Sequence, residues 1–553
     1  MKTQVKSIIV SLLITTILAA IGYYFFLPVI NIKAADFWIS VSALIIVYIL
    51  SYEFCLLIFH AYKYADFNSV SHKPSIYLSV VLILLVVAFG LCNLFTSPLL
   101  HAKRYASLLK VNEDCDFNTD LSQTLSSDAI AIMDTSSARK LGNRKLGSLN
   151  NLVSQYNVSN DYTQISYDNS PAKVSALEYA GFFKYMKNKK SGIPGYVLVS
   201  PVDMPAEYVT LNENMKYVPS AYFSHNLMRT IRFAYPTKMI YNAHFEIDEE
   251  GIPYYVASVY DNKIGIFGGR DVSGMVTVNP VDGSTSYYKI SEIPDWIDLV
   301  YDGDLICSQY NYYGTLQKGY WNSKLSAVGC KVTTDDYGYI AMDNDIWIYT
   351  GVTSVNSDAS NIGFILANER TKEANFYTIA GADEASAQTA AEGEVQQYGY
   401  KASFPSLINI DGYATYIMVL KDSGGLVKMY AAVNAEQYNI VTTASTQKEC
   451  IEKYKRRMSG GIDSALEEES LTTDQQVTSS QEEIIDESLF TEQQVTIKKL
   501  EQIVVNGNTY IYLLTTEDAL YHAKYVDVLP MINVSSGDTL TIRVYNDQFL
   551  CEN

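Results

Sequence analysis

Two stretches of the chain share one order of apolar and polar positions. In residues 362–397, an apolar run at 364–367 precedes a polar turn, a Tyr-bearing run at 375–379 and an Ala- and Glu-rich segment from 382. Residues 428–457 repeat this order, and Thr446 and Glu449 there have the spacing of a helix capping box. Aromatic and β-branched residues favour strands, whereas Ala and Glu favour helices. Each stretch therefore predicts a β-hairpin followed by a helix.

Weaker copies of this pattern lie upstream. Residues 274–290 predict a hairpin followed by a short helix at 291–301, and residues 195–210 predict a hairpin with a weaker turn. The four copies begin at 195, 274, 363 and 428, and this spacing is too irregular for a solenoid. We therefore expect an α+β fold in which repeated hairpin-helix units occupy 181–458.

Further segments complete the predicted order of elements. Two more hairpins are predicted, at 245–259 and at 407–422, the second around Asp411 and Gly412. Residues 101–180 have the composition of a connector poor in helix, apart from a helix predicted at 172–187.

The C-terminal part of the chain changes composition twice. Residues 459–493 are polar and acidic, which is typical of a flexible linker. Residues 494–553 regain strand patterning around Asn506 and Gly507, a strong hairpin signal. They predict a small β-barrel of the SH3 or OB type.

Three long apolar runs open the chain, at 7–30, 37–59 and 76–94. Each has the roughly 20 residues that a helix needs to cross a ~30 Å hydrocarbon core. The first run exceeds the apolar core of about 7–15 residues that a cleaved signal peptide has. We therefore predict a multi-pass anchor of three helices within residues 1–100.

The orientation of this anchor is not fixed by charge. The flanking Lys and Arg residues number four on each side of the predicted membrane. The first span often dominates orientation, and long domains cross largely regardless of their charge. We therefore expect the N-terminus inside the cell and the large domain in the extracytoplasmic space.

Glu53 lies within the second apolar run. A carboxylate inside a membrane is costly and suggests a functional role, for instance in a transporter-associated subunit. The alternatives are a protonated or snorkelling side chain, or one that is hydrogen-bonded to another helix.

The charges are distributed unevenly along the chain. Of 41 basic and 60 acidic residues, residues 1–110 hold eight and three, which leaves 33 and 57 in the remainder, a net charge of −24. This acidic remainder argues against a nucleic-acid partner. The same argument disfavours oligonucleotide binding by a C-terminal barrel of the OB type. The 45 Tyr residues suit a binding face, although Tyr also fills ordinary cores.

Few residues suggest catalytic chemistry. With six His, no H-E-x-x-H motif and no C-x-x-C pair, we expect no catalytic triad, zinc site or cofactor. Cys307 and Cys330 could form a disulfide or stay free buried thiols. A weak candidate for calcium, which lacks the spacing of an EF-hand, comprises Asp335, Asp336, Asp343 and Asp345. The glycines of KIGIFGGRD, residues 263–271, indicate a turn and not a Walker loop.

Several segments carry a family resemblance. NPVDGSTSYYKISEIPDWIDLVY, NIGFILANERTKEANFYTIAGADEASA and LKDSGGLVKMYAAVNAEQYNIV resemble uncharacterised membrane-anchored proteins of low-GC Gram-positive bacteria. The hairpin-helix units resemble PepSY modules. The resemblance covers most of residues 1–458 and implies an extracytoplasmic regulatory or binding role.

The function that we expect is that of a membrane-anchored binding or scaffold protein of the cell envelope. We expect binding because the repeated modules carry no evident catalytic site. The expected partners are the lipid bilayer and a protein or cell-wall component. The alternative is an envelope hydrolase that uses carboxylates such as Glu246, Asp248 and Glu249.

Overall fold

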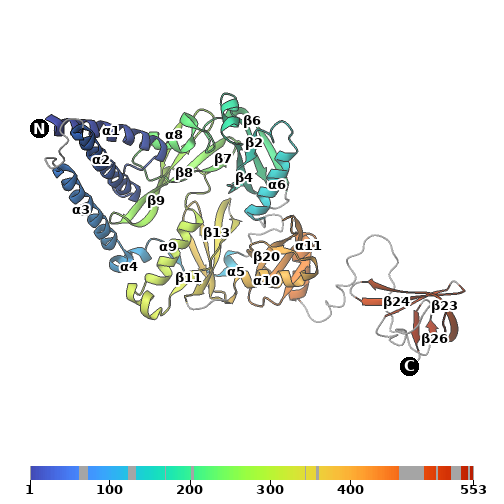
Figure 1. Ribbon diagram of the computed structural model, residues 1–553. Helices are drawn as coiled ribbons and strands as arrows, with labels where there is room; N and C mark the ends of the chain where they lie inside the picture. The colour runs from blue at the N-terminus through green and yellow to red at the C-terminus, as the bar shows by residue number, and fades with distance from the viewer. Residues whose placement is uncertain are drawn as a thin grey trace. The chain divides into compact units, whose positions relative to one another are not determined.

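The structure is a computed structural model in which helices and several sheets are mixed (Figure 1). It describes the chain except residues 1, 62–71, 122–132, 169, 201–204, 343, 356–359, 460–490, 506–507, 518, 525–536, 546–547 and 552–553. The chain divides into two compact units, Met1–Ser464 and Ala465–Asn553, here called unit 1 and unit 2. Most of the linker expected at 459–493 lies outside the described residues.

Three helices at the start of unit 1 are long and apolar enough to cross a membrane: α1 (Lys2–Phe26), α2 (Ala35–Ala61) and α3 (Lys73–Phe95). Most of their large apolar side chains are exposed, which suits contact with lipid. The first helix ends four residues earlier than the apolar run. Leu27 precedes a proline and takes a φ of 50°, so the helix cannot continue through it.

The first sheet has the order β2-β4-β5-β6, and β3 also pairs with β4. Its strands are β2 (Tyr156–Val158), β3 (Thr163–Tyr167), β4 (Ser170–Tyr179), β5 (Ile193–Val199) and β6 (Ala206–Met215). The helix predicted at 172–187 is therefore wrong over 172–179, which belongs to β4; only the end of the segment is helical, as the short helix α7 (Phe182–Asn188). β4 has partners on both edges and buries Val174, Ala176 and Leu177, so sheet packing overrides the helix propensity of its Ala, Glu and Lys residues.

The expected connector is likewise part of the folded unit. Its residues form β2, β3, β4 and the helices α4 (Pro98–Ala106), α5 (Phe117–Asp120) and α6 (Thr135–Gly147), and β1 (Val111–Asn112) pairs in parallel with β16 (Ala374–Tyr377). Capping side chains rather than long apolar stripes begin α5 and α6, namely Asp116 and Asp134. This is why the segment lacked a strong helix signal.

The second sheet is antiparallel, with the order β10-β9-β8-β7. Its strands are β7 (His244–Ile247), β8 (Pro253–Ile264), β9 (Gly268–Val278) and β10 (Thr285–Lys289). The hairpins predicted at 245–259 and 274–290 are both present. The helix predicted at 291–301 is wrong, because only one 3₁₀ turn, η3 (Ile290–Glu292), precedes Pro294, and the next helix is α9 (Gly303–Leu316), capped by Asp302.

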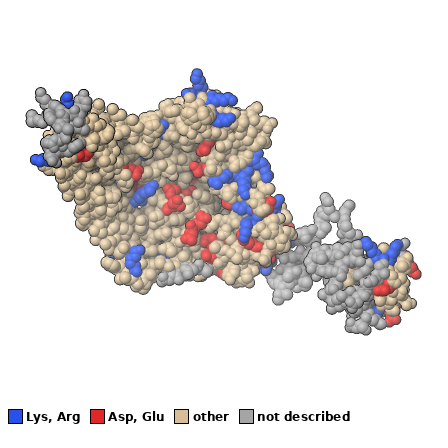
Figure 2. Space-filling model, in the orientation of Figure 1, with Lys and Arg blue, Asp and Glu red and all other residues tan. Residues whose placement is uncertain are grey.

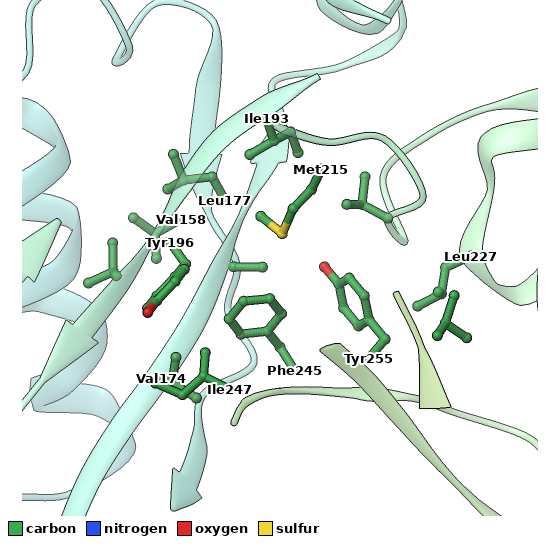
Figure 3. Packing of buried hydrophobic residues seen from close by; sticks show 14 of the residues in the cluster. Val158, Val174, Leu177, Ile193, Tyr196, Met215, Leu227, Phe245, Ile247 and Tyr255 are labelled. Atoms are coloured by element: carbon green, nitrogen blue, oxygen red, sulfur yellow. The ribbon is translucent and has the colours of Figure 1, made fainter. Parts of the chain in front are cut away.

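The first two sheets share one core (Figure 3). Its centre is aromatic, since the rings of Tyr196 and Phe245 lie 5.6 Å apart and those of Phe245 and Tyr255 lie 5.4 Å apart. Ile193 and Met215 close it on the side of β5 and β6.

The third and fourth sheets contain the two strongest predicted units. The third has the order β1-β16-β15-β13-β11, with β12 paired to β13, and the fourth has the order β18-β20-β21-β22, with β19 paired to β20. The predicted hairpin-helix units are β15-β16-α10 and β21-β22-α11. Asp383 caps α10, and Thr446 caps α11 as its spacing to Glu449 indicated. The bounds are β11 (Lys331–Thr333), β12 (Gly338–Met342), β13 (Asp345–Ser354), β14 (Ser360–Asn361), β15 (Gly363–Asn368), β17 (Gly381–Ala382), α10 (Glu384–Glu394), β18 (Lys401–Ala402), β19 (Ser406–Ile410), β20 (Tyr413–Lys421), β21 (Val427–Asn434), β22 (Val441–Ala444) and α11 (Gln447–Ser459).

Several contacts between described residues join the apolar helices to the rest of unit 1, and two of them involve close packing of the backbone. Arg232, buried in α8 (Leu227–Ala234), donates hydrogen bonds to the carbonyl oxygens of Leu27, Lys238 and Ile240. At the tip of the β8–β9 hairpin, a Cβ on Gly268 would lie 2.4 Å from Tyr105 Oη and 2.5 Å from Thr96 O. The Gly-rich turn expected at 263–271 is this tip, and the glycines let it approach the α3–α4 junction.

In the part of unit 2 that the structure describes, five strands form a sheet that closes on itself in the order β23-β24-β25-β27-β26. The strands are β23 (Thr491–Val505), β24 (Asn508–Thr515), β25 (Leu520–Lys524), β26 (Thr539–Tyr545) and β27 (Gln548–Cys551). Asn506 and Gly507 lie outside the described residues, and the strands that flank them pair antiparallel. The SH3 or OB type of this sheet stays a prediction.

Candidate functional site

Charged side chains from separate elements are buried together in unit 1. Glu246 on β7 is 0% exposed, Asp298 in the loop before α9 is 1% exposed, Glu369 after β15 is 1% exposed and Lys173 on β4 is 2% exposed. Burial of a charge is costly unless the charge is paired, so we follow the partners of each side chain.

The first part of this cluster is held by hydrogen bonds and ion pairs. Glu246 accepts hydrogen bonds from the backbone N–H groups of Asp298 (3.1 Å) and Leu299 (3.2 Å), and His244 Nε2 lies 2.6 Å from its Oε1. Arg370 pairs with Asp298 at 2.7 Å, and the same distance separates it from Asp345. Burial and the Glu246 carboxylate raise the pKa of Asp298 above its usual range. This chain of contacts ties β7 and β13 to the loop before α9.

The second part of the cluster is not fully paired. Among the described residues, the buried atom Glu369 Oε1 has no hydrogen-bond partner. Burial, followed by the charges of Asp302, Asp298 and Glu246, raises the pKa of Glu369 well above its usual range. Burial also lowers the pKa of Lys173 to about 8, although Asp134 and Glu369 act in the opposite direction. A carboxyl group and an amine are thus held out of water with few compensating contacts.

A cavity of about 260 Å³ lies against Glu369 and His244. Three more of its lining residues carry buried polar atoms that have no partner in the described part of the chain: Arg139 Nε, Tyr162 Oη and Gln164 Nε2. Gln164 is 5% exposed. Buried polar groups in proteins are usually hydrogen-bonded, so four unpartnered atoms around one cavity indicate a site for a polar ligand.

A larger cavity of about 800 Å³ adjoins the first, and the two share Thr135, Gln164 and Tyr339 among their lining residues. Its walls include Lys173 and five acidic residues, Asp134, Asp335, Asp336, Asp383 and Glu384. Asp134 and Asp383 cap the helices α6 and α10. Figure 2 shows Asp and Glu side chains gathered over the middle of the visible face of unit 1. The wall of the cavity is thus rich in carboxylates.

The carboxylates expected for a hydrolase do not form one constellation. Glu246 is buried and paired as described above. Asp248 accepts from the N–H groups of Glu250 and Ile252 and so stabilises the β7–β8 turn, while Glu249 is exposed on that turn. Each of the three therefore has different surroundings.

The described aspartates considered for calcium do not form one site either. Asp335 and Asp336 are exposed at the larger cavity, whereas Asp345 pairs with Arg370 and accepts from Asn368 Nδ2. Asp343 lies outside the described residues. In the part of the chain that the structure describes, no group of three or more His, Cys, Asp or Glu side chains is placed to hold a metal ion.

Glu53 is hydrogen-bonded to another helix, which was one of the alternatives considered for this intramembrane carboxylate. Ser75 Oγ donates to Glu53 Oε1, and His72 Nδ1 lies 2.9 Å from Oε2. Both partners belong to the start of α3, so the carboxylate links α2 to α3. Cys307 and Cys330, which could have formed a disulfide, are free thiols.

Sequence reasoning missed Lys173, Asp298, Glu369 and Arg370. Lys173 lay in a predicted helix, where a charged residue needs no explanation, and Glu369 and Arg370 lay in a predicted polar turn. The alternation in KVSALEY was the one available signal, since it places Lys173 among apolar strand positions.

Comparisons with known proteins add little. No known protein family and no curated protein matches the chain. Among solved structures, the chain is similar to the polysaccharide lyase Uly1, with 8% identity and a TM-score of 0.16 over 70% of this chain and 76% of that one. It is also similar to a mutant of B. megaterium levansucrase, with 8% identity and a TM-score of 0.17 over 80% of this chain and 97% of that one. Scores this low establish neither a shared fold nor a shared function.

Proposed function

We propose that the protein is a membrane-anchored binding protein of the cell envelope, and that its ligand site is the pair of adjoining cavities in unit 1. The observation that carries this proposal is Glu369 Oε1, a buried acceptor without a partner among the described residues. Gln164, whose Nε2 is an unpartnered donor in the described part of the chain, lines the same cavity. Leaving such groups unsatisfied costs about 1–3 kcal/mol each, which a polar ligand would recover.

The charge of the site favours a ligand that carries an amine. Five carboxylates and one lysine line the larger cavity, and Glu369 faces the smaller one. An ammonium group would supply the donor that Glu369 lacks and would offset the excess negative charge. A cavity of about 800 Å³ also has the size of ordinary small-molecule sites. The ligand would be a free amine or an amine-bearing group of a cell-wall component.

Binding fits this site better than catalysis. The buried carboxylate Glu246 is held by two backbone donors and a histidine, which leaves it poorly placed to act on a substrate. Asp248 accepts a hydrogen bond that stabilises the β7–β8 turn, and Glu249 is exposed on the same turn.

The test is a calorimetric titration of the full-length protein in nanodiscs with glucosamine and with N-acetylglucosamine. The two sugars share a ring and differ in the charged amine. We expect saturable binding of glucosamine, little binding of the acetylated sugar, and loss of binding in Glu369→Gln. Glu249→Gln, an exposed carboxylate on the β7–β8 turn, is the matched control and should bind as the unmodified protein does. Equal titrations for both sugars, or for Glu369→Gln and the unmodified protein, would count against the proposal.

The finer architecture belongs to the same proposal. The three apolar helices would make a multi-pass anchor with the α+β part in the extracytoplasmic space, the hairpin-helix units would be PepSY-like modules, and unit 2 would be a barrel of the SH3 or OB type. Family membership among the membrane-anchored proteins of low-GC Gram-positive bacteria is proposed with them. Protection of a C-terminal epitope tag from protease in intact cells would contradict the orientation.

A further inference from the structure

An exposed apolar patch lies on α7 and on the 3₁₀ turn η2 (Phe223–His225). Its members are Phe182 (39% exposed), Phe183 (83%), Met186 (39%), Tyr222 (41%) and Phe223 (51%). The ring of Phe182 lies 5.6 Å from that of Phe183, 5.1 Å from that of Tyr222 and 6.3 Å from that of Phe223. These residues, here called the aromatic patch, form one surface. Contiguous apolar surface of this kind marks an interaction site.

The aromatic patch is anchored from beneath. Tyr185 on α7 is 2% exposed, and its hydroxyl donates to Tyr222 O at 2.7 Å. This bond holds α7 and η2 together, so the patch is presented by fixed backbone.

The patch is continuous with the apolar helix α1. Arg229 on α8 donates to Phe223 O through Nη1 and to Tyr24 O through Nε, the latter at 3.1 Å, and its guanidinium lies 4.0 Å from the centre of the Tyr24 ring. Phe233 on α8 stacks on Tyr23 at 5.9 Å. One arginine therefore separates the patch from the end of α1, which is where a membrane-crossing helix would leave the bilayer. Tyr and Arg are typical of that interface.

Lysines surround the aromatic patch. Lys184, Lys187, Lys189 and Lys190 lie on or just after α7, and the sequence has no acidic residue between Glu178 and Asp203. Burial, followed by the charges of Lys216 and Lys189, lowers the pKa of His225 in η2. Figure 2 shows Lys and Arg side chains gathered at the edge of unit 1 where Figure 1 labels β6. This local positive charge contrasts with a net charge of −19 for the chain.

From these observations we infer that α7 and η2 form a second membrane contact. The aromatic patch enters the headgroup region of the same bilayer that α1 crosses, and the lysines bind its anionic phosphates. Exposed Phe and Tyr beside Lys is the composition of surfaces that lie in a membrane interface. Continuity with α1 favours the bilayer over a second protein, because α1 already brings its own exposed Phe25 and Phe26 to that depth.

The test is photocrosslinking of the full-length protein in nanodiscs. We would place p-benzoylphenylalanine at Phe183, where the side chain is exposed and substitution does not disturb the core, and as control at Tyr398, which is 58% exposed after α10. Lipid adducts should form at position 183 and not at position 398. Their yield should be higher when phosphatidylglycerol is present than in phosphatidylcholine alone, and Lys187→Glu should lower it about fivefold.

Two results would overturn the inference. One is a yield of lipid adducts at position 183 no higher than at position 398. The other is adducts at position 183 that join two protein chains in place of protein and lipid. A melting temperature equal to that of the unmodified protein, measured on each variant, shows that the fold is retained.

Discussion

Arg370 Nη2 donates a hydrogen bond to Asp298 Oδ1 over 2.7 Å, and the two residues are 72 positions apart in the chain. The arginine side chain is 17% exposed and the aspartate side chain 2%. Through Asp298 and Glu246 this pair connects the turn after β15 to β7, and through Asp345 it connects to β13. The cavities lie beside this network, so its integrity should affect both stability and binding.

Loss of Arg370 should be strongly destabilising. Arg370→Met removes the ion-pair partner of the buried Asp298, which among the described residues keeps only the hydrogen bond from the Ser166 N–H. Breaking a buried pair in this way costs about 3–5 kcal/mol. The free energy of unfolding, from denaturant titration of the full chain in detergent, measures this. The double variant Arg370→Met with Asp298→Asn should recover part of the loss. A double variant no more stable than Arg370→Met would contradict the pairing.

Replacement of Glu369 by Gln should stabilise the protein at neutral pH while it abolishes ligand binding. The pKa of Glu369 is raised in the folded state, so the folded state binds more protons than the unfolded state once the pH exceeds the ordinary value of 4.5. The stability of the unmodified protein therefore falls as the pH rises through that window, whereas the Gln variant has no such group. Unfolding measured from pH 4 to pH 8 should show the two proteins diverging with rising pH. Parallel curves would contradict the prediction.

Lys173 should have the opposite effect at alkaline pH, where it should make the free energy of unfolding increase as the pH rises. Burial lowers its pKa from 10.5 to about 8, so between these values the unfolded state binds more protons than the folded state. The contribution of Lys173 to the free energy of unfolding therefore rises with pH across that window and is least favourable below pH 8. The buried tyrosines also titrate at high pH, so the measured quantity is the difference between the unmodified protein and Lys173→Met. That difference should change between pH 8 and pH 10.5 and be constant below.

Gly268→Ala should loosen the contact between the β8–β9 hairpin and the α3–α4 junction. The new Cβ would lie 2.4 Å from Tyr105 Oη and 2.5 Å from Thr96 O. Overpacking of this kind typically costs about 1–3 kcal/mol, which a lower melting temperature would report. Gly393→Ala in α10 is the control, since nothing lies within 4 Å of its added Cβ. An unchanged melting temperature in Gly268→Ala would show that the tip does not approach the junction so closely.

Arg232→Met should release the loop between α1 and α2 from unit 1. Its guanidinium donates to Leu27 O (2.9 Å), Lys238 O (2.8 Å) and Ile240 O (2.6 Å), and the residue is 3% exposed. Three carbonyl groups, of which that of Ile240 is buried, would lose their donor, and Lys could not reach all of them. Faster proteolysis within residues 27–34 is the expected result, with Arg456→Met, on the exposed side of α11, as the control. Equal rates of cleavage would contradict this anchoring role.

Local patterns were sufficient for the elements whose partners are close in sequence. The apolar runs predicted α1, α2 and α3 to within a few residues, because a membrane span needs only continuous hydrophobicity. The units β15-β16-α10 and β21-β22-α11 were predicted for a similar reason: turn residues, β-branched runs and the cap Thr446 all act over a few positions. Asp411 and Gly412, with φ of 52° and 90°, form the tight turn that their sequence indicated.

Tertiary structure alone decided the rest. Residues 172–179, predicted as helix, form a strand because β3 and β5 supply hydrogen bonds along both edges of β4, and neither partner can be inferred from the segment itself. The candidate site combines Lys173, Glu246, Asp298, Glu369 and Arg370, which come from strands and loops far apart in the chain. Their burial follows from how β3 and β4 pack against β7 and β13. The pKa shifts of Lys173, Asp298 and Glu369 and the unpartnered atom Glu369 Oε1 are consequences of that burial. The sequence by itself determined a membrane-associated chain of mixed helix and strand, but the position of a polar cavity among buried charges depends on long-range packing that no local pattern encodes.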